Sequence, residues 1–129
     1  MPSPVPFWIA FVTTVVLLIV AAATGFSKKR KIHLWAGPAT IVALGLAIWQ
    51  VEKLSRNYSF PPEVLSFHLI FAKAGGLLAL PVVATGIWLS RSERARRFHR
   101  AAVILWLVVV LIATGTGLYM FGLGTPKAG

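Results

Sequence analysis

Four long runs of apolar residues, separated by short polar segments, constrain this chain more than any other feature. The runs span residues 7–26, 32–51, 63–90 and 101–123. A helix rises about 1.5 Å per residue, so each run is long enough to cross a hydrocarbon core of about 30 Å. The 129 residues are 57% hydrophobic and 12% charged, which is too apolar for a soluble domain of this size. The sequence predicts an all-α membrane protein, a four-transmembrane-helix up-and-down bundle forming one domain over residues 1–129.

The predicted transmembrane helices span about residues 6–27, 32–52, 62–90 and 98–123. The first is interpreted as a retained helix, because a signal peptide needs a basic segment before a shorter apolar one. No charged side chain precedes Lys28, so that basic segment is missing. The third helix is expected to begin at Pro61–Pro62, since proline is favoured at the first helical position.

Basic residues are concentrated in two of the three loops. The net charge is +10, from 13 Lys and Arg against 3 Asp and Glu. The clustered cations are Lys28, Lys29, Arg30, Lys31, Arg91, Arg94, Arg96, Arg97 and Arg100. The positive-inside rule predicts that these loops face the cytoplasm, with both termini on the outer, periplasmic side of an inner (plasma) membrane. Cations confined between membrane spans indicate a lipid bilayer as partner and argue against nucleic acid.

A tripeptide, Ala-Thr-Gly, recurs at the ends of the first and third helices, at residues 23–25 and 84–86. After each comes a basic loop and then a histidine, His33 or His99. The chain is therefore predicted to consist of two related helical hairpins. Gly and Thr at these positions also permit close contacts between helices.

A second spacing overlaps the first. Thr85–Gly86 follows His68 in the chain, and Thr116–Gly117 follows His99. The number of residues between histidine and threonine is the same in both cases. This separation corresponds to about 25 Å along a helix. We expect each histidine at one membrane face and each Thr-Gly pair at the other.

His33 and His99 begin the second and fourth helices on the same predicted side of the membrane. In a bundle wound in chain order these helices are diagonal, so the two imidazoles lie at matching depth. This arrangement suits axial ligation of a haem iron from both sides. The alternative is that interfacial histidines cap helices or contact lipid headgroups. Zinc is disfavoured, because two imidazoles without an acidic partner do not complete a tetrahedral site.

The segments around the three histidines, 31–37, 66–68 and 97–100, resemble the cytochrome b-561 family of transmembrane electron carriers. The four-helix core of that family has a haem-ligating histidine near the start of each helix. The resemblance implies that His33 and His99 hold one haem b. It also implies a second haem held by the first and third helices.

The first helix departs from that family pattern. Phe7 or Trp8 stands where its histidine is expected, so only His68 is left of the second pair. Three interpretations of His68 stay open: a packed residue without a cofactor, a ligand of a second haem or chlorin completed from outside, or a hydrogen-bond partner of quinone. One haem b per chain is expected from the protein's own ligands.

Three cations are further candidate site residues. Lys73 falls near mid-bilayer, where a charge is costly. It is interpreted either as a salt bridge to a partner subunit or as a contact to a haem propionate or quinone. Arg97 and Arg100 flank His99 and are expected to neutralise haem propionates. The positive-inside rule alone explains the same two arginines.

The sequence thus predicts a membrane-embedded haem b electron-transfer protein that exchanges electrons with quinone or with a partner redox centre. It is expected to be a small subunit of a larger redox complex, an electron carrier or oxidoreductase subunit rather than a stand-alone enzyme. The alternative is a cofactor-free structural or assembly subunit. A transporter is disfavoured, because the helices carry no paired acidic residues and no broken segments.

Overall fold

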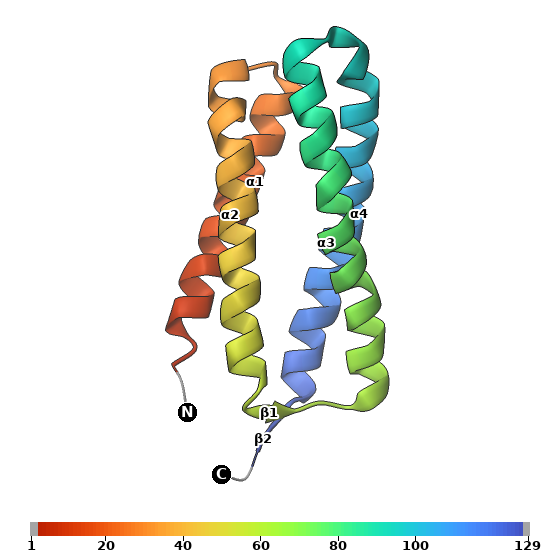
Figure 1. The fold of residues 1–129 in the computed structure, drawn as a ribbon. Helices are drawn as coiled ribbons and strands as arrows, with labels where there is room; N and C mark the ends of the chain where they lie inside the picture. The colour runs from red at the N-terminus through yellow and green to blue at the C-terminus, as the bar shows by residue number, and fades with distance from the viewer. Residues whose placement is uncertain (1–2, 128–129) are drawn as a thin grey trace. The chain divides into compact units, whose positions relative to one another are not determined.

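The structure, a computed structural model, describes residues 3–127 and is built almost entirely of helices (Figure 1). The long helices are α1 (Val5–Phe26), α2 (Arg30–Ser55), α3 (Pro62–Arg91) and α4 (Arg96–Leu123). The short elements are the 3₁₀ turn η1 (Glu93–Ala95) and the strands β1 (Tyr58–Ser59) and β2 (Thr125–Pro126). Each helix end lies within three residues of the predicted position.

All four helices are long and apolar enough to cross a membrane. Large aliphatic side chains lie on the outside, and Leu77, for example, is 69% exposed. Such an apolar surface is stable against lipid tails rather than water. The prediction of a multi-pass membrane protein with four helical spans is confirmed. The predicted side of the membrane for the termini, which extend beyond the described residues, stays a prediction.

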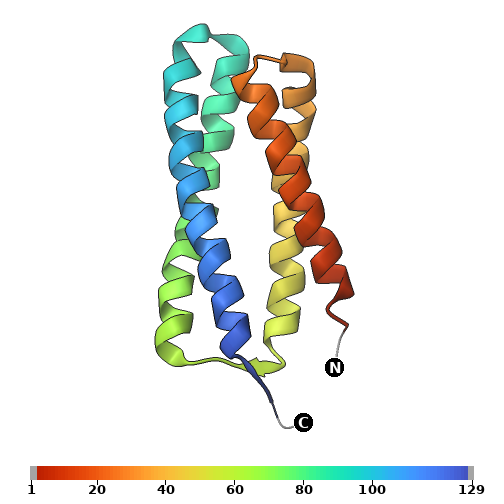
Figure 2. The same cartoon turned by 180° about the vertical axis from the view of Figure 1, so that it is seen from behind.

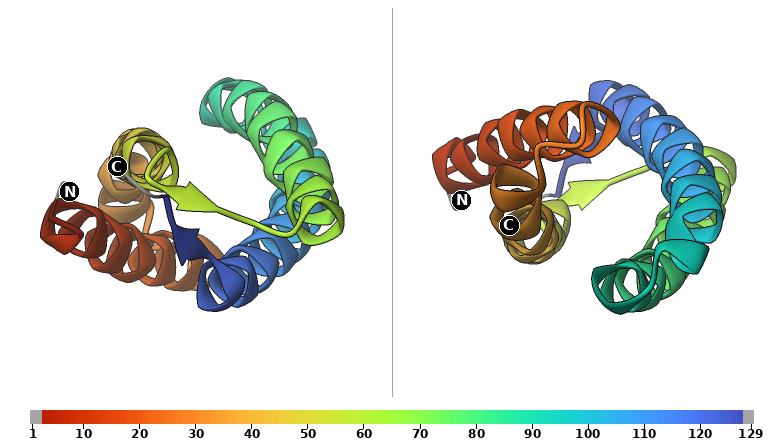
Figure 3. Two further views of the ribbon diagram at one scale, coloured as in Figure 1. Left: turned by 90° about the horizontal axis from the view of Figure 1, so that it is seen from below. Right: turned by 90° about the horizontal axis from the view of Figure 1, so that it is seen from above.

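The helices pair into two compact hairpins. The first contains residues 3–59 together with 126–127, and the second contains residues 60–125. Within each hairpin the two helices run antiparallel and cross obliquely, as Figures 2 and 3 show from behind and from the helix ends. In the first hairpin the N-terminal end of α1 diverges from the C-terminal end of α2 (Figures 1 and 2). Closure of the two hairpins into one bundle stays a prediction.

The first hairpin is packed through small residues. The buried positions of α2 include Ala36, Thr40, Ala43 and Ala47, which are spaced by four and three residues and so share one helical face. The Thr40 hydroxyl donates to the Ala36 carbonyl at 2.7 Å, which satisfies this buried group within its own helix. Small, self-satisfied residues allow helices to approach closely in a membrane.

The second hairpin is held at its middle by a tryptophan. The indole Nε1–H of Trp106 on α4 donates to the Gly75 carbonyl of α3 at 3.0 Å. Trp106 is only 4% exposed, so this hydrogen bond lies away from lipid and water. A buried indole N–H requires such an acceptor, and the Gly75 carbonyl supplies it.

The turn of the first hairpin places a basic residue in the left-handed region. Lys28 has φ of 59°, and the amide of Lys29 donates to the Thr24 carbonyl at 2.8 Å. This closes the C-terminus of α1 in the manner of a left-handed cap. His33 lies in the first turn of α2, so the tight reversal brings it back beside the end of α1.

Candidate functional site

Each of the three histidines lies against a glycine at the far end of the neighbouring helix in its own hairpin. The pairs are His33 with Gly25, His99 with Gly86, and His68 with Gly117. A β-carbon on the glycine would lie 2.9, 3.2 and 2.9 Å, respectively, from Cε1 of the imidazole. These distances are closer than β-carbons normally approach, so each glycine makes the room in which a ring sits.

The Nδ1 atom of each imidazole also has a hydrogen-bond partner on that neighbouring helix. Nδ1 of His99 lies 3.0 Å from the Thr85 hydroxyl, and Nδ1 of His68 lies 2.9 Å from the Thr116 hydroxyl. For His33 the partner is the backbone carbonyl of Ala21, at 2.7 Å. We call each arrangement, a glycine against the ring and an oxygen on Nδ1, a histidine seat.

The hydrogen-bond network determines which ring nitrogen carries the proton. The Thr85 hydroxyl donates its single proton to the Pro81 carbonyl at 2.6 Å, so its oxygen accepts from Nδ1–H of His99. Thr116 donates in the same way to the Ile112 carbonyl at 2.9 Å. For His33 the partner is a carbonyl, which only accepts. The neutral rings therefore carry Nδ1–H and have their lone pair on Nε2.

This tautomer suits metal ligation. Histidines that bind metals commonly donate the other ring N–H to a carbonyl, carboxylate or similar acceptor, which fixes the orientation of the ring and raises its basicity. Each seat meets both requirements for Nε2 ligation. Within residues 3–127 no three His, Cys, Asp or Glu side chains cluster as a metal site, but axial ligation of haem requires only two imidazoles.

The second hairpin contains two seats that are reciprocal. His68, near the start of α3, binds the end of α4, whereas His99, near the start of α4, binds the end of α3. The threonine near the far end of each histidine's own helix is thus the acceptor for the other histidine. The sequence contains this signal as a matched spacing, which predicts each histidine and each Thr-Gly pair at opposite membrane faces but does not predict the hydrogen bond between them.

The first hairpin contains only the seat of His33. At its other end, both the histidine and the threonine acceptor of a seat are replaced by other residues. Phe7 stands in the same spacing to Thr24 as His68 does to Thr85. Gln50 stands in the same spacing to His33 as Thr116 does to His99. The ring of Phe7 instead lies 5.1 Å from that of Trp8, as part of an aromatic cluster. The expected absence of a histidine ligand on the first helix is therefore matched by the absence of its acceptor.

The cationic candidates have other surroundings. Lys73 is exposed on α3 and forms no ion pair within residues 3–127. The guanidinium of Arg97 lies 4.9 Å from the centroid of the Phe98 ring. Arg97 and Arg100 both line a recess at the start of α4. Their predicted contact with haem propionates stays a prediction.

These features define a class: a multi-pass membrane protein of two helical hairpins that carries histidines with an ordered Nδ1–H. Comparison of the chain with protein-family models, with curated proteins and with solved structures found no match. The functional argument therefore depends on the histidine seats themselves.

Proposed function

We propose that the protein is a haem b electron-transfer subunit in which Nε2 of His33 and Nε2 of His99 bind one iron axially. The observation that carries the proposal is that both rings lie against a glycine with Nδ1 on an oxygen of the neighbouring helix. Each histidine is the fourth residue of its helix, α2 or α4, and each follows a basic turn. Two spans separate these turns in the chain, so the proposal puts both turns at one face of the membrane and the two imidazoles at one depth.

The seats explain what the chain's own residues contribute. The bond from Nδ1–H to the Ala21 carbonyl or the Thr85 hydroxyl holds the ring at one rotation and increases the electron density on Nε2. Gly25 and Gly86 leave the space in which each ring lies against the neighbouring helix. Haem supplies the one-electron chemistry when bound, and the protein supplies ligation, burial and electrostatics.

The redox partner is inferred to lie within or at the membrane. The segments between the helices, residues 27–29, 56–61 and 92–95, are too short to form a soluble domain. Lys73 lies twelfth in α3, roughly 17 Å from its start, where an unpaired charge facing lipid is costly. A neighbouring membrane subunit with an acidic residue, or a quinone, would stabilise it. We therefore propose a small subunit of a larger redox complex in the plasma membrane, with the basic turns cytoplasmic.

A reduced-minus-oxidised absorption spectrum of the purified protein tests the proposal. We expect a low-spin haem b spectrum that is lost in His33→Ala and in His99→Ala. His68→Ala is the matched control, because it removes an equally seated imidazole at the other end of the second hairpin. Absence of haem from protein expressed with ample haem, or unchanged haem in both His33→Ala and His99→Ala, would contradict the assignment.

One observation favours a second candidate function, that of a cofactor-free structural subunit. The hydrogen bonds of all three seats join the two helices of a hairpin, and interhelical hydrogen bonds stabilise helix pairs in membranes by about 0.6–2 kcal/mol. Under this alternative, replacing each histidine lowers hairpin stability by a similar amount, with no spectral change. The same three variants therefore distinguish the two candidates.

A further inference from the structure

A basic recess opens at the turn between α3 and α4, with a volume of ≈ 470 Å³. Its charged lining consists of four arginines and one glutamate: Arg94, Arg96, Arg97, Arg100 and Glu93. We call it the arginine recess. Its lining comes from η1 and from the first turns of α4, so it lies at the predicted membrane–water interface.

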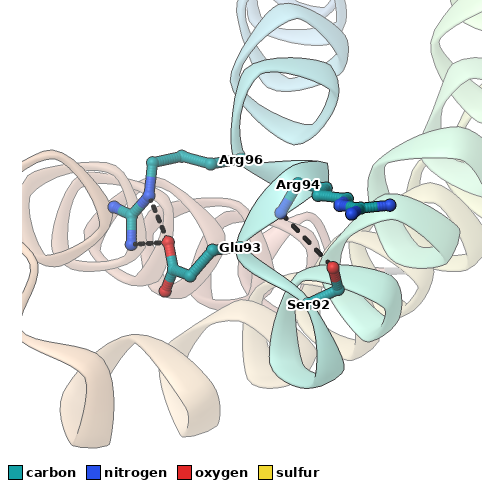
Figure 4. Close-up of polar contacts among 4 residues, drawn as sticks. All are labelled: Ser92, Glu93, Arg94 and Arg96. Atoms are coloured by element: carbon teal, nitrogen blue, oxygen red, sulfur yellow. Dashed lines mark hydrogen bonds and ion pairs between the residues drawn. The ribbon is translucent and has the colours of Figure 1, made fainter.

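The arginine recess carries an excess of positive charge, because its lining has four guanidinium groups and a single carboxylate. That carboxylate, of Glu93, is occupied by Arg96, whose Nη2 lies 2.7 Å and whose Nε lies 2.9 Å from the same oxygen (Figure 4). The amino end of α4, which begins at Arg96, adds the partial positive charge of a helix N-terminus. The recess therefore favours an anion.

An apolar surface continues from the recess along α4. Ala101 and Ile104 form the apolar part of its lining. Ile104, Val108 and Leu111 follow at spacings of four and three residues, so they share the side of the helix on which the recess lies. All three are exposed, Leu111 by 66%. An anionic head next to an exposed aliphatic strip matches a phospholipid better than it matches a free anion.

The recess faces away from the proposed haem ligand. At about 100° per residue, its α4 lining is centred about 130° around the helix from His99. Trp106, which binds α3, lies on the His99 side of α4 by the same reckoning. The recess therefore does not face a haem held by His99, and a haem propionate is not its expected ligand.

We propose that the arginine recess binds the phosphodiester of an anionic phospholipid, whose acyl chain lies along Ile104, Val108 and Leu111. Arginines bind phosphate oxygens through paired N–H donors, and basic pockets at the ends of membrane helices bind anionic headgroups. The inference does not require haem, because the recess faces away from His99; it assigns Arg97 and Arg100, which the sequence predicted as contacts of haem propionates, to the lipid phosphate instead.

The test uses the full-length protein in detergent, titrated with phosphatidylglycerol or phosphatidylcholine of identical acyl chains and measured by native mass spectrometry. Arg94→Gln/Arg97→Gln/Arg100→Gln is expected to weaken phosphatidylglycerol binding at least about tenfold. Lys28→Gln/Lys29→Gln/Lys31→Gln removes the same charge from the other basic turn and is expected to bind like the wild type. Inorganic phosphate at millimolar concentration is expected not to displace the lipid.

Two outcomes would overturn the proposal. Equal weakening in the arginine and lysine variants would show attraction to basic surface in general, and displacement by inorganic phosphate would show a small-anion site. Glu93→Gln provides a test that does not depend on the folding of the triple variant. It releases Arg96 from its ion pair, so tighter phosphatidylglycerol binding is expected, and unchanged or weaker binding would contradict the proposal.

Discussion

The two hairpins follow one plan but differ in how many histidines they seat. The second has a seat at each end, His68 with Thr116 and His99 with Thr85, whereas the first has only that of His33. The missing seat falls where the N-terminal end of α1 diverges from α2 (Figure 1). The difference teaches that a seat is a unit of two helices, because the histidine and the glycine against its ring are present or absent together.

The seats also differ in the acceptor on Nδ1. His99 uses the side chain of Thr85, whereas His33 uses the backbone carbonyl of Ala21. Thr24, which corresponds to Thr85 in the repeat, donates to the Val20 carbonyl at 2.6 Å just as Thr85 donates to the Pro81 carbonyl, so the two seats differ only in which oxygen lies on Nδ1. A side-chain acceptor is removable by mutation and a backbone acceptor is not. This asymmetry provides matched pairs of variants whose expected effects differ in size.

The largest effect is expected from filling the space against a ligand ring. Gly86→Val places a branched side chain where a β-carbon alone would lie 3.2 Å from Cε1 of His99, so the imidazole must leave its seat. We expect loss of the low-spin haem spectrum, as in His99→Ala. Gly117→Val, which displaces His68 by the same steric mechanism, is expected to retain that haem.

The control for helix propensity is Gly37→Val, because nothing lies within 4 Å of a β-carbon built there. It introduces the same β-branched residue into a helix without touching a histidine. Retention of haem in Gly86→Val, or its loss in Gly37→Val, would show that the glycines do not act through the rings.

The next effect is a gain. Phe7→His combined with Gln50→Thr and Val51→Gly would rebuild the missing seat at the open end of the first hairpin, as the counterpart in the repeat of the His68 seat. If the seat defines a haem ligand, the haem content measured by pyridine haemochrome should rise from one towards two per chain. Phe7→His alone lacks the Nδ1 acceptor and is expected to gain less. If the haem content of the triple variant stays at one per chain, the seat does not define a haem ligand, and the difference between the hairpins concerns helix packing alone.

A smaller effect is expected from removing one acceptor. Thr85→Val keeps the shape of the side chain but removes the oxygen on Nδ1 of His99, and loss of such a partner costs about 10- to 100-fold in metal affinity. Haem release should therefore be faster in Thr85→Val and restored in Thr85→Ser. Thr24→Val makes the same change in the first hairpin and is expected to change haem release less, since the Ala21 carbonyl stays on Nδ1 of His33. Equal rates in Thr85→Val and Thr24→Val would contradict the role given to the hydroxyl.

The helices were predictable from the sequence and the seats were not, for a physical reason. An apolar run long enough to span a bilayer is a local property, so the bounds of α1 to α4 agree with the expectation to within three residues. A seat depends on the register between two antiparallel helices, which the sequence specifies only indirectly. The matched histidine-to-threonine spacings contained that register for Thr85 and Thr116, but the Ala21 carbonyl has no sequence signal, because every residue has a backbone oxygen.

The smallest effect concerns the packing difference between the hairpins. Trp106→Phe removes the buried hydrogen bond to the Gly75 carbonyl while keeping an aromatic ring, and the bond is worth about 1 kcal/mol. The second hairpin should therefore lose about that much stability in a detergent unfolding titration, with the haem spectrum unchanged because Trp106 is not in a seat. Trp35→Phe is the matched control, since Trp35 is 61% exposed on α2. If Trp35→Phe destabilises the protein as much as Trp106→Phe does, the indole hydrogen bond contributes no specific stability to the second hairpin. The packing of the two hairpins would then not differ through this bond.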